Sequence, residues 1–285
     1  MNYRHAFHAG NFADVVKHAV LARIVDYLQR KETPIRFLDT HAGSGLYDLR
    51  SAEAERGGEW QAGIGRLLDA ANRRLPLAPD LHDLLSPYLD AVRRFNPADQ
   101  FTTYPGSPAL LRFWLRGDDR LTACELEASA HAALEDALRG DARCKAIRID
   151  GWTALSAYIP PKERRGLVLI DPPFEQQGEY ARLATALGAA WRKWPTGLYL
   201  AWYPVKDPKD LDLFMTALAQ QGIGKMLRAE ASLAPATETT RLRGTGLIVI
   251  NPPWTLREEM DVLLPALAGL FAPGRGEALV APLSP

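Results

Sequence analysis

The chain has 285 residues, 47% hydrophobic and 24% charged, which is ordinary for a globular protein with a substantial core. Lysine plus arginine and aspartate plus glutamate are equal at 34 each, which excludes an overall basic field that would hold nucleic acid; any such binding needs a local patch. No apolar stretch could span a bilayer and no signal peptide is visible, so we expect a cytoplasmic protein. Cys124 and Cys144 lack metal-ligand spacing and indicate buried thiols in a reducing compartment.

The first residues form a block of polar and aromatic side chains without apolar periodicity. Residues 3–11 are Tyr-Arg-His-Ala-Phe-His-Ala-Gly-Asn, and a broad apolar stripe predicts a helix over 11–31 that is capped by Asn11 or Asp14. A functionless tail of this kind would be disordered, yet this one carries rings and hydrogen-bonding groups suited to holding a base. We expect it to fold across a cleft; in the alternative, Phe7 only staples it to the helix.

Histidines and basic residues gather in the same block. Four of the six histidines, at positions 5, 8, 18 and 41, lie in it or near it. Their spacing is not that of a metal site, so we expect no metal and assign them to hydrogen bonding at the mouth of a cleft. Lys17 and Arg4 either bind phosphates at this mouth or are ordinary surface charges.

The next predicted element is a short apolar strand at 35–40 that runs into a glycine turn. Thr-His-Ala-Gly-Ser-Gly occupies 40–45, and Gly43 allows a tight turn and close approach of the backbone to a ligand. This is not the Gly-x-Gly-x-x-Gly pattern of dinucleotide binders, because Asp48 stands where the third glycine would fall. The pattern Asp-x-x-x-Gly-x-Gly instead looks like the cofactor loop of class I methyltransferases.

An unusually long interval follows the glycine turn. About 75 residues intervene before the next core strand, well beyond ordinary connection lengths. Within it, residues 59–73 and 79–95 are predicted to be helical. We therefore interpret 46–105 as an inserted helical subdomain, and 1–45 together with 106–285 as the core domain.

Helices and strands alternate through the rest of the chain. We expect helices at 108–115, 127–139, 178–192 and 207–221, a helical turn at 153–158, and strands at 120–124, 145–150, 166–171, 197–203, 225–232 and 245–251. Alternation of this kind predicts an α/β fold with a doubly wound, mostly parallel sheet. A polar loop at 234–244 joins the last two strands without a helix, so these strands should form an antiparallel edge.

Acidic residues follow two of the predicted core strands. Glu125 ends the strand at 120–124, and Asp150 ends the strand at 145–150. A carboxylate at the first position suits the hydroxyls of a ribose, and one at the second suits the amino group of an adenine. Each acid alone could be a helix cap, but acids at successive strand ends in this order favour a nucleoside-containing cofactor.

The most informative strand end is that of Gly166-Leu-Val-Leu-Ile, an apolar run typical of a strand buried on both faces. It stops at Asp171-Pro172-Pro173-Phe174, where the prolines fix a rigid loop. Asp171 and the Pro172 carbonyl are then two adjacent acceptors for an exocyclic amine, and Phe174 is a flat surface for stacking. This signature resembles that of amino-group methyltransferases; the alternative is a helix-capping aspartate before a proline turn.

A second strand ends in a related motif, Asn251-Pro252-Pro253-Trp254. Asn-Pro-Pro-aromatic also occurs in amino-group methyltransferases, so the string alone cannot decide between the two. Asp171 ends the fourth core strand, next to the expected cofactor cleft, whereas Asn251 ends the final strand, which we expect at the edge. We therefore assign the chemistry to Asp171, and expect Asn251 to serve as a cap and turn before a C-terminal helix.

Eight motifs spread over nearly the full length carry a family resemblance: Tyr-Arg-His-x-Phe-His-Ala-Gly-Asn (3–11), Asp-x-x-Lys-His (14–18), Leu-Asp-Thr-His-Ala-Gly-x-Gly (38–45), Tyr-Pro-Gly-Ser-Pro (104–108), Asp-Gly (150–151), Leu-Ile-Asp-Pro-Pro-Phe (169–174), Trp-Tyr-Pro-Val (202–205) and Ile-Asn-Pro-Pro-Trp (250–254). On these motifs the chain resembles the bacterial 23S ribosomal RNA adenine-N6 methyltransferase J family. Phe174 departs from the Tyr that the family often has, but either ring can stack. The resemblance implies a class I core with a helical insertion.

The resemblance also implies roles residue by residue. The cofactor-contacting positions of the family fall on His18, His41, Ser107, Glu125, Asp150, Gly151 and Asp171, to which the glycine turn adds Gly43. Asp171 also matches the catalytic acceptor, acting with Pro172 and Phe174. Tyr3, His5 and Lys17 match the N-terminal segment that closes over the substrate adenine.

We therefore expect methyl transfer from S-adenosyl-L-methionine to the N6 amine of an adenine in 23S ribosomal RNA. The RNA would be naked or in an assembly intermediate, and the enzyme a monomer without a membrane partner. The same site chemistry fits a DNA adenine-N6 methyltransferase or a protein glutamine methyltransferase. A nicotinamide-dependent oxidoreductase conflicts with the glycine pattern, and a non-catalytic nucleic-acid-binding module leaves Asp171-Pro172-Pro173 unexplained.

Overall fold

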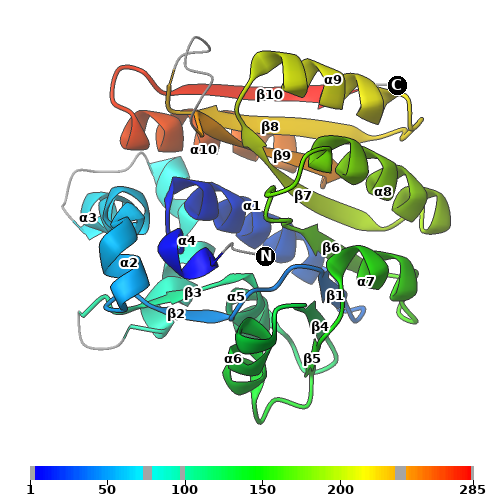
Figure 1. The fold of residues 1–285 in the computed structure, drawn as a ribbon, viewed down its shortest axis with the longest axis horizontal. Coiled ribbons are helices and arrows are strands. Elements are labelled where there is room, and N and C mark those ends of the chain that lie inside the picture. Colours follow the sequence, from blue (N-terminus) through cyan, green and yellow to red (C-terminus); the bar gives the residue numbers. More distant parts are fainter. Residues whose placement is uncertain (1–3, 73–78, 97–99, 235–241, 284–285) are drawn as a thin grey trace.

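A computed structural model describes residues 4–72, 79–96, 100–234 and 242–283 of the chain. Its centre is an eight-stranded sheet in the order β10-β8-β9-β7-β6-β1-β4-β5 (Figure 1). The strands are β1 (Arg36–Asp39), β4 (Arg120–Cys124), β5 (Cys144–Ile147), β6 (Gly166–Ile170), β7 (Leu198–Val205), β8 (Met226–Ser232), β9 (Gly244–Ile250) and β10 (Glu277–Leu283). β5, β4, β1, β6 and β7 pair in parallel, whereas β9 pairs antiparallel with both β7 and β8. The predicted doubly wound α/β fold is confirmed.

Helices cover both faces of this sheet. One face packs against α1 (Phe12–Gln29), α5 (Ser107–Trp114), α6 (Ala128–Leu138) and α10 (Leu256–Phe271), and the other against α7 (Gly151–Ala157), α8 (Glu179–Lys193) and α9 (Pro208–Ala219). The apolar run of β6 serves both layers, because Leu167 and Leu169 join one hydrophobic cluster while Val168 and Ile170 join the other. Continuous hydrophobicity in this strand therefore reflects burial on two faces.

Residues 46–105 contain more structure than their periodicity predicts. Their elements are β2 (Leu46–Asp48), α2 (Ala52–Gly57), a π-helical turn (Gln61–Gly65), α3 (Arg66–Asn72), α4 (Pro79–Arg94) and β3 (Thr103–Pro105). The helix expected over 59–73 is interrupted at Gly63, whose backbone is not helical and lies against the carbonyl of Gly10. β2 and β3 have three residues each and are too short to show an alternating pattern. Because α4 shares a hydrophobic cluster with α1 and α10, treating 46–105 as a separate subdomain remains a proposal.

The end of the sheet differs from the prediction in strand order. β8 and β9 pair antiparallel as expected, but β9 lies inside the sheet between β7 and β8, and β10 forms the outer edge. β10 was not predicted: residues 278–283 are apolar but do not alternate with polar residues, and they include Pro282, which disfavours a strand. All seven residues of β10 are at least partly exposed. Of the expected loop at 234–244, residues 235–241 lie outside the described part of the chain.

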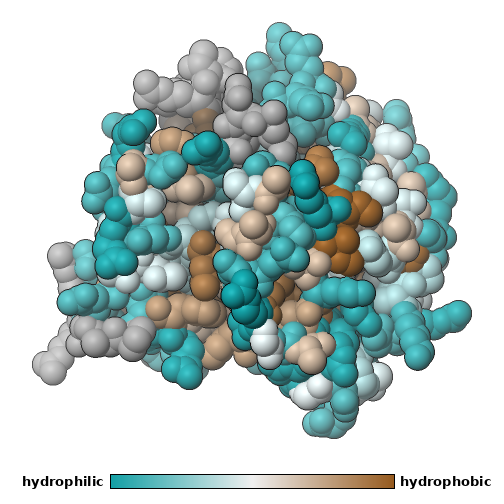
Figure 2. Space-filling model, turned by 60° about the horizontal axis from the view of Figure 1, so that its bottom comes forward, coloured by the Kyte–Doolittle hydropathy of each residue, from teal (hydrophilic) through white to brown (hydrophobic). Residues whose placement is uncertain are grey.

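The surface offers no membrane-spanning element among the described residues, where no helix is long and apolar enough to cross a bilayer. Figure 2 shows that hydrophilic residues cover most of one face and that hydrophobic residues reach the surface mainly near its centre.

Candidate active site

A pocket of about 690 Å³ opens at the carboxyl ends of β1, β4, β5, β6 and β7. β1 lies between β4 and β6. The chain continues from β1 to β4 and β5 on one side and then crosses to β6 and β7 on the other. Open α/β sheets bind ligands at such a switch point. Every predicted site residue that the structure describes lines this pocket: His5, Lys17, His18, His41, Gly43, Ser107, Glu125, Asp150, Gly151, Asp171, Pro172 and Phe174. Tyr3 lies outside the described residues. The individual roles of these side chains remain proposals.

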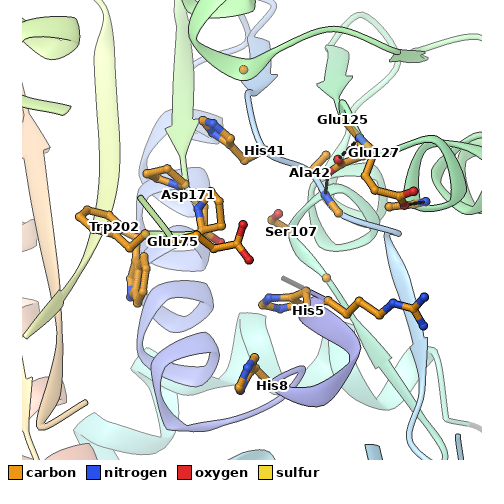
Figure 3. Close-up of a pocket in the computed structure, with 18 of the residues that line it drawn as sticks. His5, His8, His41, Ala42, Ser107, Glu125, Glu127, Asp171, Glu175 and Trp202 are labelled. Carbon is orange, nitrogen blue, oxygen red and sulfur yellow. Dashed lines mark hydrogen bonds between the residues drawn. The ribbon is translucent and has the colours of Figure 1, made fainter. Parts of the chain in front are cut away.

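Glu125 is held by two backbone amides at the end of β4. Its carboxylate oxygens accept hydrogen bonds from Gly43 N at 3.0 Å and from Glu127 N at 2.8 Å (Figure 3). Gly43 has φ of 61°, and a side chain there would collide with the hydroxyl of Tyr47. The glycine turn and the acid after β4 therefore form one rigid unit, with glycine required by both conformation and space.

Asp150 and Gly151 begin helix α7 beside His41. The carboxylate of Asp150 accepts a hydrogen bond from Thr153 N at 2.9 Å, so it does cap this helix while lining the pocket. A Cβ at Gly151 would lie 2.3 Å from the carbonyl of Thr40 and 2.6 Å from the His41 ring, which explains the absence of a side chain. Burial lowers the pKa of His41 to about 4, so this ring is neutral near pH 7.

Ser107 lies against a buried aspartate at the end of β1. Its hydroxyl donates to Asp39 Oδ2 at 2.7 Å, whereas Asp39 Oδ1 is buried without a partner among the described residues. Burial raises the pKa of Asp39 to about 7, despite the hydrogen bond from Ser107.

His18 is a buried neutral ring in the pocket wall. Its Nδ1 lies 2.7 Å from the hydroxyl of Tyr104, which lies 3.0 Å from the hydroxyl of Tyr88. Burial lowers the pKa of His18 to about 3. Its Nε2 is buried and makes no hydrogen bond within the described chain, so it is available to a bound group.

Asp171 is joined to helix α1 by a buried ammonium. Lys17 Nζ donates to Asp171 Oδ2 and, at 2.8 Å, to Asp14 Oδ1. Burial alone would lower the pKa of Lys17, but the two carboxylates outweigh it and raise that pKa above its usual value. Burial alone would likewise raise the pKa of Asp14, which Lys17 and His5 hold well below its usual range. The Lys17 ammonium and the Asp14 carboxylate therefore stay charged near neutral pH.

The N-terminal segment reaches the same cluster through the second oxygen of Asp14. Asp14 Oδ2 lies 3.0 Å from His5 Nε2 and accepts a hydrogen bond from Gly10 N at 2.9 Å. His5 begins a short 3-10 turn, His5–Phe7, and its ring packs against Tyr47 with centroids 5.1 Å apart. His5 is thus placed in the pocket by bonds to α1, while the expected cap of that helix is Asn11, which accepts from Asp14 N.

Aromatic rings surround Phe174 on the side of the pocket opposite Glu125. Phe174 has φ of 51°, an uncommon backbone conformation for a bulky residue that is associated with functional loops. Its ring contacts Tyr180 with centroids 5.0 Å apart and meets the edge of Trp202 at 5.6 Å. Figure 3 shows Trp202 and Asp171 together, facing the cavity from the side away from Glu125 and Glu127.

The second proline motif lies at the other end of the sheet. Because β9 runs antiparallel to β7, its last residue Ile250 pairs with Tyr199 near the start of β7, which places Asn251 away from the pocket. Asn251 has φ of 54° and donates to the carbonyls of Pro195 and Gly197 at 2.8 and 2.7 Å. The expected turn is present, but the expected cap is not, since Thr255 precedes α10.

Two features of the site escaped the sequence analysis. Asp14 is expected only as a helix cap and as part of the motif at 14–18, although the spacing Asp-x-x-Lys places its carboxylate and Lys17 on one face of a helix. Trp202 was seen only within a motif, and the pairing of β6 with β7 is what brings it beside Phe174.

Comparison with known proteins adds a family to this geometry. Residues 32–282 match a family described as "Ribosomal RNA large subunit methyltransferase D, RlmJ". Curated proteins named "Ribosomal RNA large subunit methyltransferase J" are 38% identical in Escherichia coli and 37% identical in Haemophilus influenzae, each alignment covering 100% of this chain and 99% of the relative. A crystal structure of a Legionella pneumophila protein is 35% identical, with a TM-score of 0.86 over 96% of this chain and 98% of that one.

Proposed function

The chain belongs to the ribosomal RNA large subunit methyltransferase J family, and from this premise we propose that it methylates the N6 amine of an adenine in 23S ribosomal RNA. The observation that carries the choice of an amine is the Asp171-Pro172-Pro173-Phe174 loop, which lies in one pocket with the Gly43–Glu125 unit. S-adenosylmethionine is the methyl donor implied by the family. A ribosomal RNA substrate further supports action in the cytoplasm, and we propose that the enzyme acts as a monomer.

The pocket residues fit this donor. Acidic side chains outnumber basic ones among the lining residues, which favours a ligand that carries a sulfonium and an ammonium. Glu125 and Asp150 would hold its ribose and adenine, while Ser107 and the unpartnered Nε2 of His18 would hold its amino-acid part. When bound, S-adenosylmethionine supplies an electrophilic methyl group.

The chain's own residues would orient the amine. The N6 lone pair of adenine is delocalised into the ring, so the nitrogen is a poor nucleophile. Hydrogen bonds from N6–H to Asp171 and to the Pro172 carbonyl favour the pyramidal nitrogen of the transition state, mainly through orientation and charge stabilisation. The proton lost from nitrogen leaves through Asp171 or water. Phe174 would stack on the flipped base, contributing about 1–3 kcal/mol.

Lys17 would hold the Asp171 carboxylate in position without occupying both of its oxygens. Its ammonium is shared between Asp171 Oδ2 and Asp14 Oδ1, so the other oxygen of Asp171 remains free to accept from an amine. Only 4% of the Lys17 side chain is exposed to solvent, so the surrounding residues restrict the movement of its ammonium. Lys17 is therefore a positioning residue in this scheme.

The decisive experiment measures methyl transfer from labelled S-adenosylmethionine to protein-free 23S ribosomal RNA, to DNA and to a protein substrate. We expect label only in the RNA, released on digestion as N6-methyladenosine. Label in DNA or in glutamine would support one of the two alternatives that share this site chemistry. In cells lacking the gene, one N6-methyladenosine should disappear from 23S ribosomal RNA.

A further inference from the structure

The segment Trp202–Lys206 forms part of the pocket wall and has no part in the chemistry described above. It comprises the carboxyl end of β7 and the residue after it. Trp202, Pro204 and Lys206 line the pocket, whereas Tyr203 and Val205 are buried in a hydrophobic cluster. The alternation of a strand therefore presents every second residue of the segment to the cavity beside Phe174.

Neighbouring elements hold this segment rigidly. Four side chains from neighbouring elements form hydrogen bonds with it. Trp202 Nε1 donates to Thr245 Oγ1 at 2.7 Å, and the Tyr203 hydroxyl donates to Glu230 Oε1 at 2.6 Å. Tyr180 donates to the Pro204 carbonyl at 2.6 Å, and Arg243 Nε donates to the Lys206 carbonyl at 2.7 Å. Arg243 is itself only 5% exposed. The backbone that carries Lys206 is thus fixed, which lowers the entropy lost when its side chain binds a ligand.

Acidic side chains dominate the pocket lining, and their charge disfavours the phosphates of RNA. Eight acidic and four basic side chains line the pocket among the described residues. Three of the bases are engaged: Lys17 with Asp14 and Asp171, Arg4 with Glu53 at 3.3 Å, and Arg182 over the ring of Trp152 at 4.8 Å. Lys206 is exposed and its side chain makes no hydrogen bond or ion pair with any described residue. Burial raises the pKa of Glu179, and the hydrogen bond from Gln176 N and the nearby charge of Lys206 partly oppose this rise.

We propose that Trp202–Lys206 is the platform on which the RNA strand rests at the pocket mouth, with Lys206 binding a phosphate next to the flipped nucleotide. The acidic lining admits a cationic donor and a neutral base but repels phosphates, so the sugar-phosphate backbone must stay at the rim. Among the bases that line this pocket, Lys206 alone is unpaired there, and it stands on the Phe174 side, where the base would enter. This inference rests on the proposed function, because it names where that RNA lies.

The test compares Lys206→Gln with Lys209→Gln, a matched change of an exposed lysine three residues further on that does not line the pocket. Binding of protein-free 23S ribosomal RNA is measured across a series of salt concentrations, and kcat and KM for the RNA are measured separately. Lys206→Gln should raise KM for the RNA about ten-fold, as for one charge-assisted hydrogen bond, with little change in kcat. The slope of log affinity against log salt should fall by about 0.7–0.9. Lys206→Arg should restore both.

The outcomes separate this inference from the function on which it rests. If wild-type protein methylates the RNA but Lys206→Gln matches Lys209→Gln in KM and in salt slope, Lys206 binds no phosphate and the platform is refuted. If the wild-type protein methylates neither protein-free 23S ribosomal RNA nor an assembly intermediate of the large subunit, the proposed function is wrong instead. A fall in kcat with unchanged KM would also overturn the platform, because it would place Lys206 in the chemical step.

Discussion

Lys17 is the residue whose replacement most directly tests the buried charge cluster. Its ammonium donates to Asp14 Oδ1 at 2.8 Å and also to Asp171 Oδ2. The substitution Lys17→Met removes the ammonium but keeps an unbranched side chain of similar length, so little packing is lost. Two carboxylates then remain near each other without the cation that compensates them.

The expected cost follows from burial. Lys17 and Asp14 are only 3% and 2% exposed, so solvent screening does not reduce the interaction. Removing one partner of a buried ion pair costs about 3–5 kcal/mol. For a chain of this size, such a loss lowers Tm by roughly 10 °C. Lys31→Met, which removes an exposed lysine just after the same helix, should cost less than about 0.5 kcal/mol.

The cost should also depend on pH. In the wild type, Asp14 has a lowered pKa, so its contribution is present above the pKa of the unfolded chain and is lost as pH falls through the folded pKa. Without Lys17, burial dominates and raises the pKa of Asp14, which penalises the folded state at neutral pH. Protonation removes this penalty. The stability gap between wild type and Lys17→Met should therefore be widest near neutral pH and narrow towards about pH 4.

Urea denaturation of wild type, Lys17→Met and Lys31→Met across this pH range measures the stability cost of each substitution and its dependence on pH. Methyl transfer should also be lost in Lys17→Met, at temperatures where the variant remains folded. The reasoning is refuted if Lys17→Met costs no more than Lys31→Met, or if the gap stays constant as the pH is lowered.

Four further predictions follow from the pocket and the strand order. Glu125→Ala should weaken S-adenosylmethionine binding by about 1–3 kcal/mol, and unchanged affinity in calorimetry would remove Glu125 from the cofactor site. Asp171→Ala should abolish methyl transfer in a folded protein, whereas Asn251→Ala should lose stability and keep most activity; the reverse pattern would assign the chemistry to the other loop. Deleting residues 2–8 should cut turnover on RNA strongly with nearly unchanged cofactor affinity, and a less stable protein of normal turnover would show that the segment is only a staple. Gly151→Ala should disturb His41 and Thr40 and weaken cofactor binding, which equilibrium binding with the RNA omitted would detect.

The sequence predicted the strand ends well because each signal there is local. The apolar run before Asp171 needs only five residues to indicate a strand buried on both faces, and all five are buried. The contact between Lys17 and Asp171 could not be predicted in this way, since it joins residues 154 positions apart and depends on how α1 packs on the sheet. The same limit applies to strand order: two adjacent strands with no helix between them must pair, but their pattern does not say which one lies outside.

Helix α1 joins the pocket and the hydrophobic core in a single rod. Its first turns carry Asp14, Lys17 and His18, and almost all of its remaining residues up to Val25 are buried. A helix rises about 1.5 Å per residue, so a core change that slides α1 by one residue displaces Lys17 from Asp171 by the same distance. The position of Lys17 relative to the acceptor Asp171 therefore depends on core packing outside the pocket. Substitutions around Val20, which never touch the pocket, would be expected to change turnover as readily as they change stability, and selection on either property acts on both.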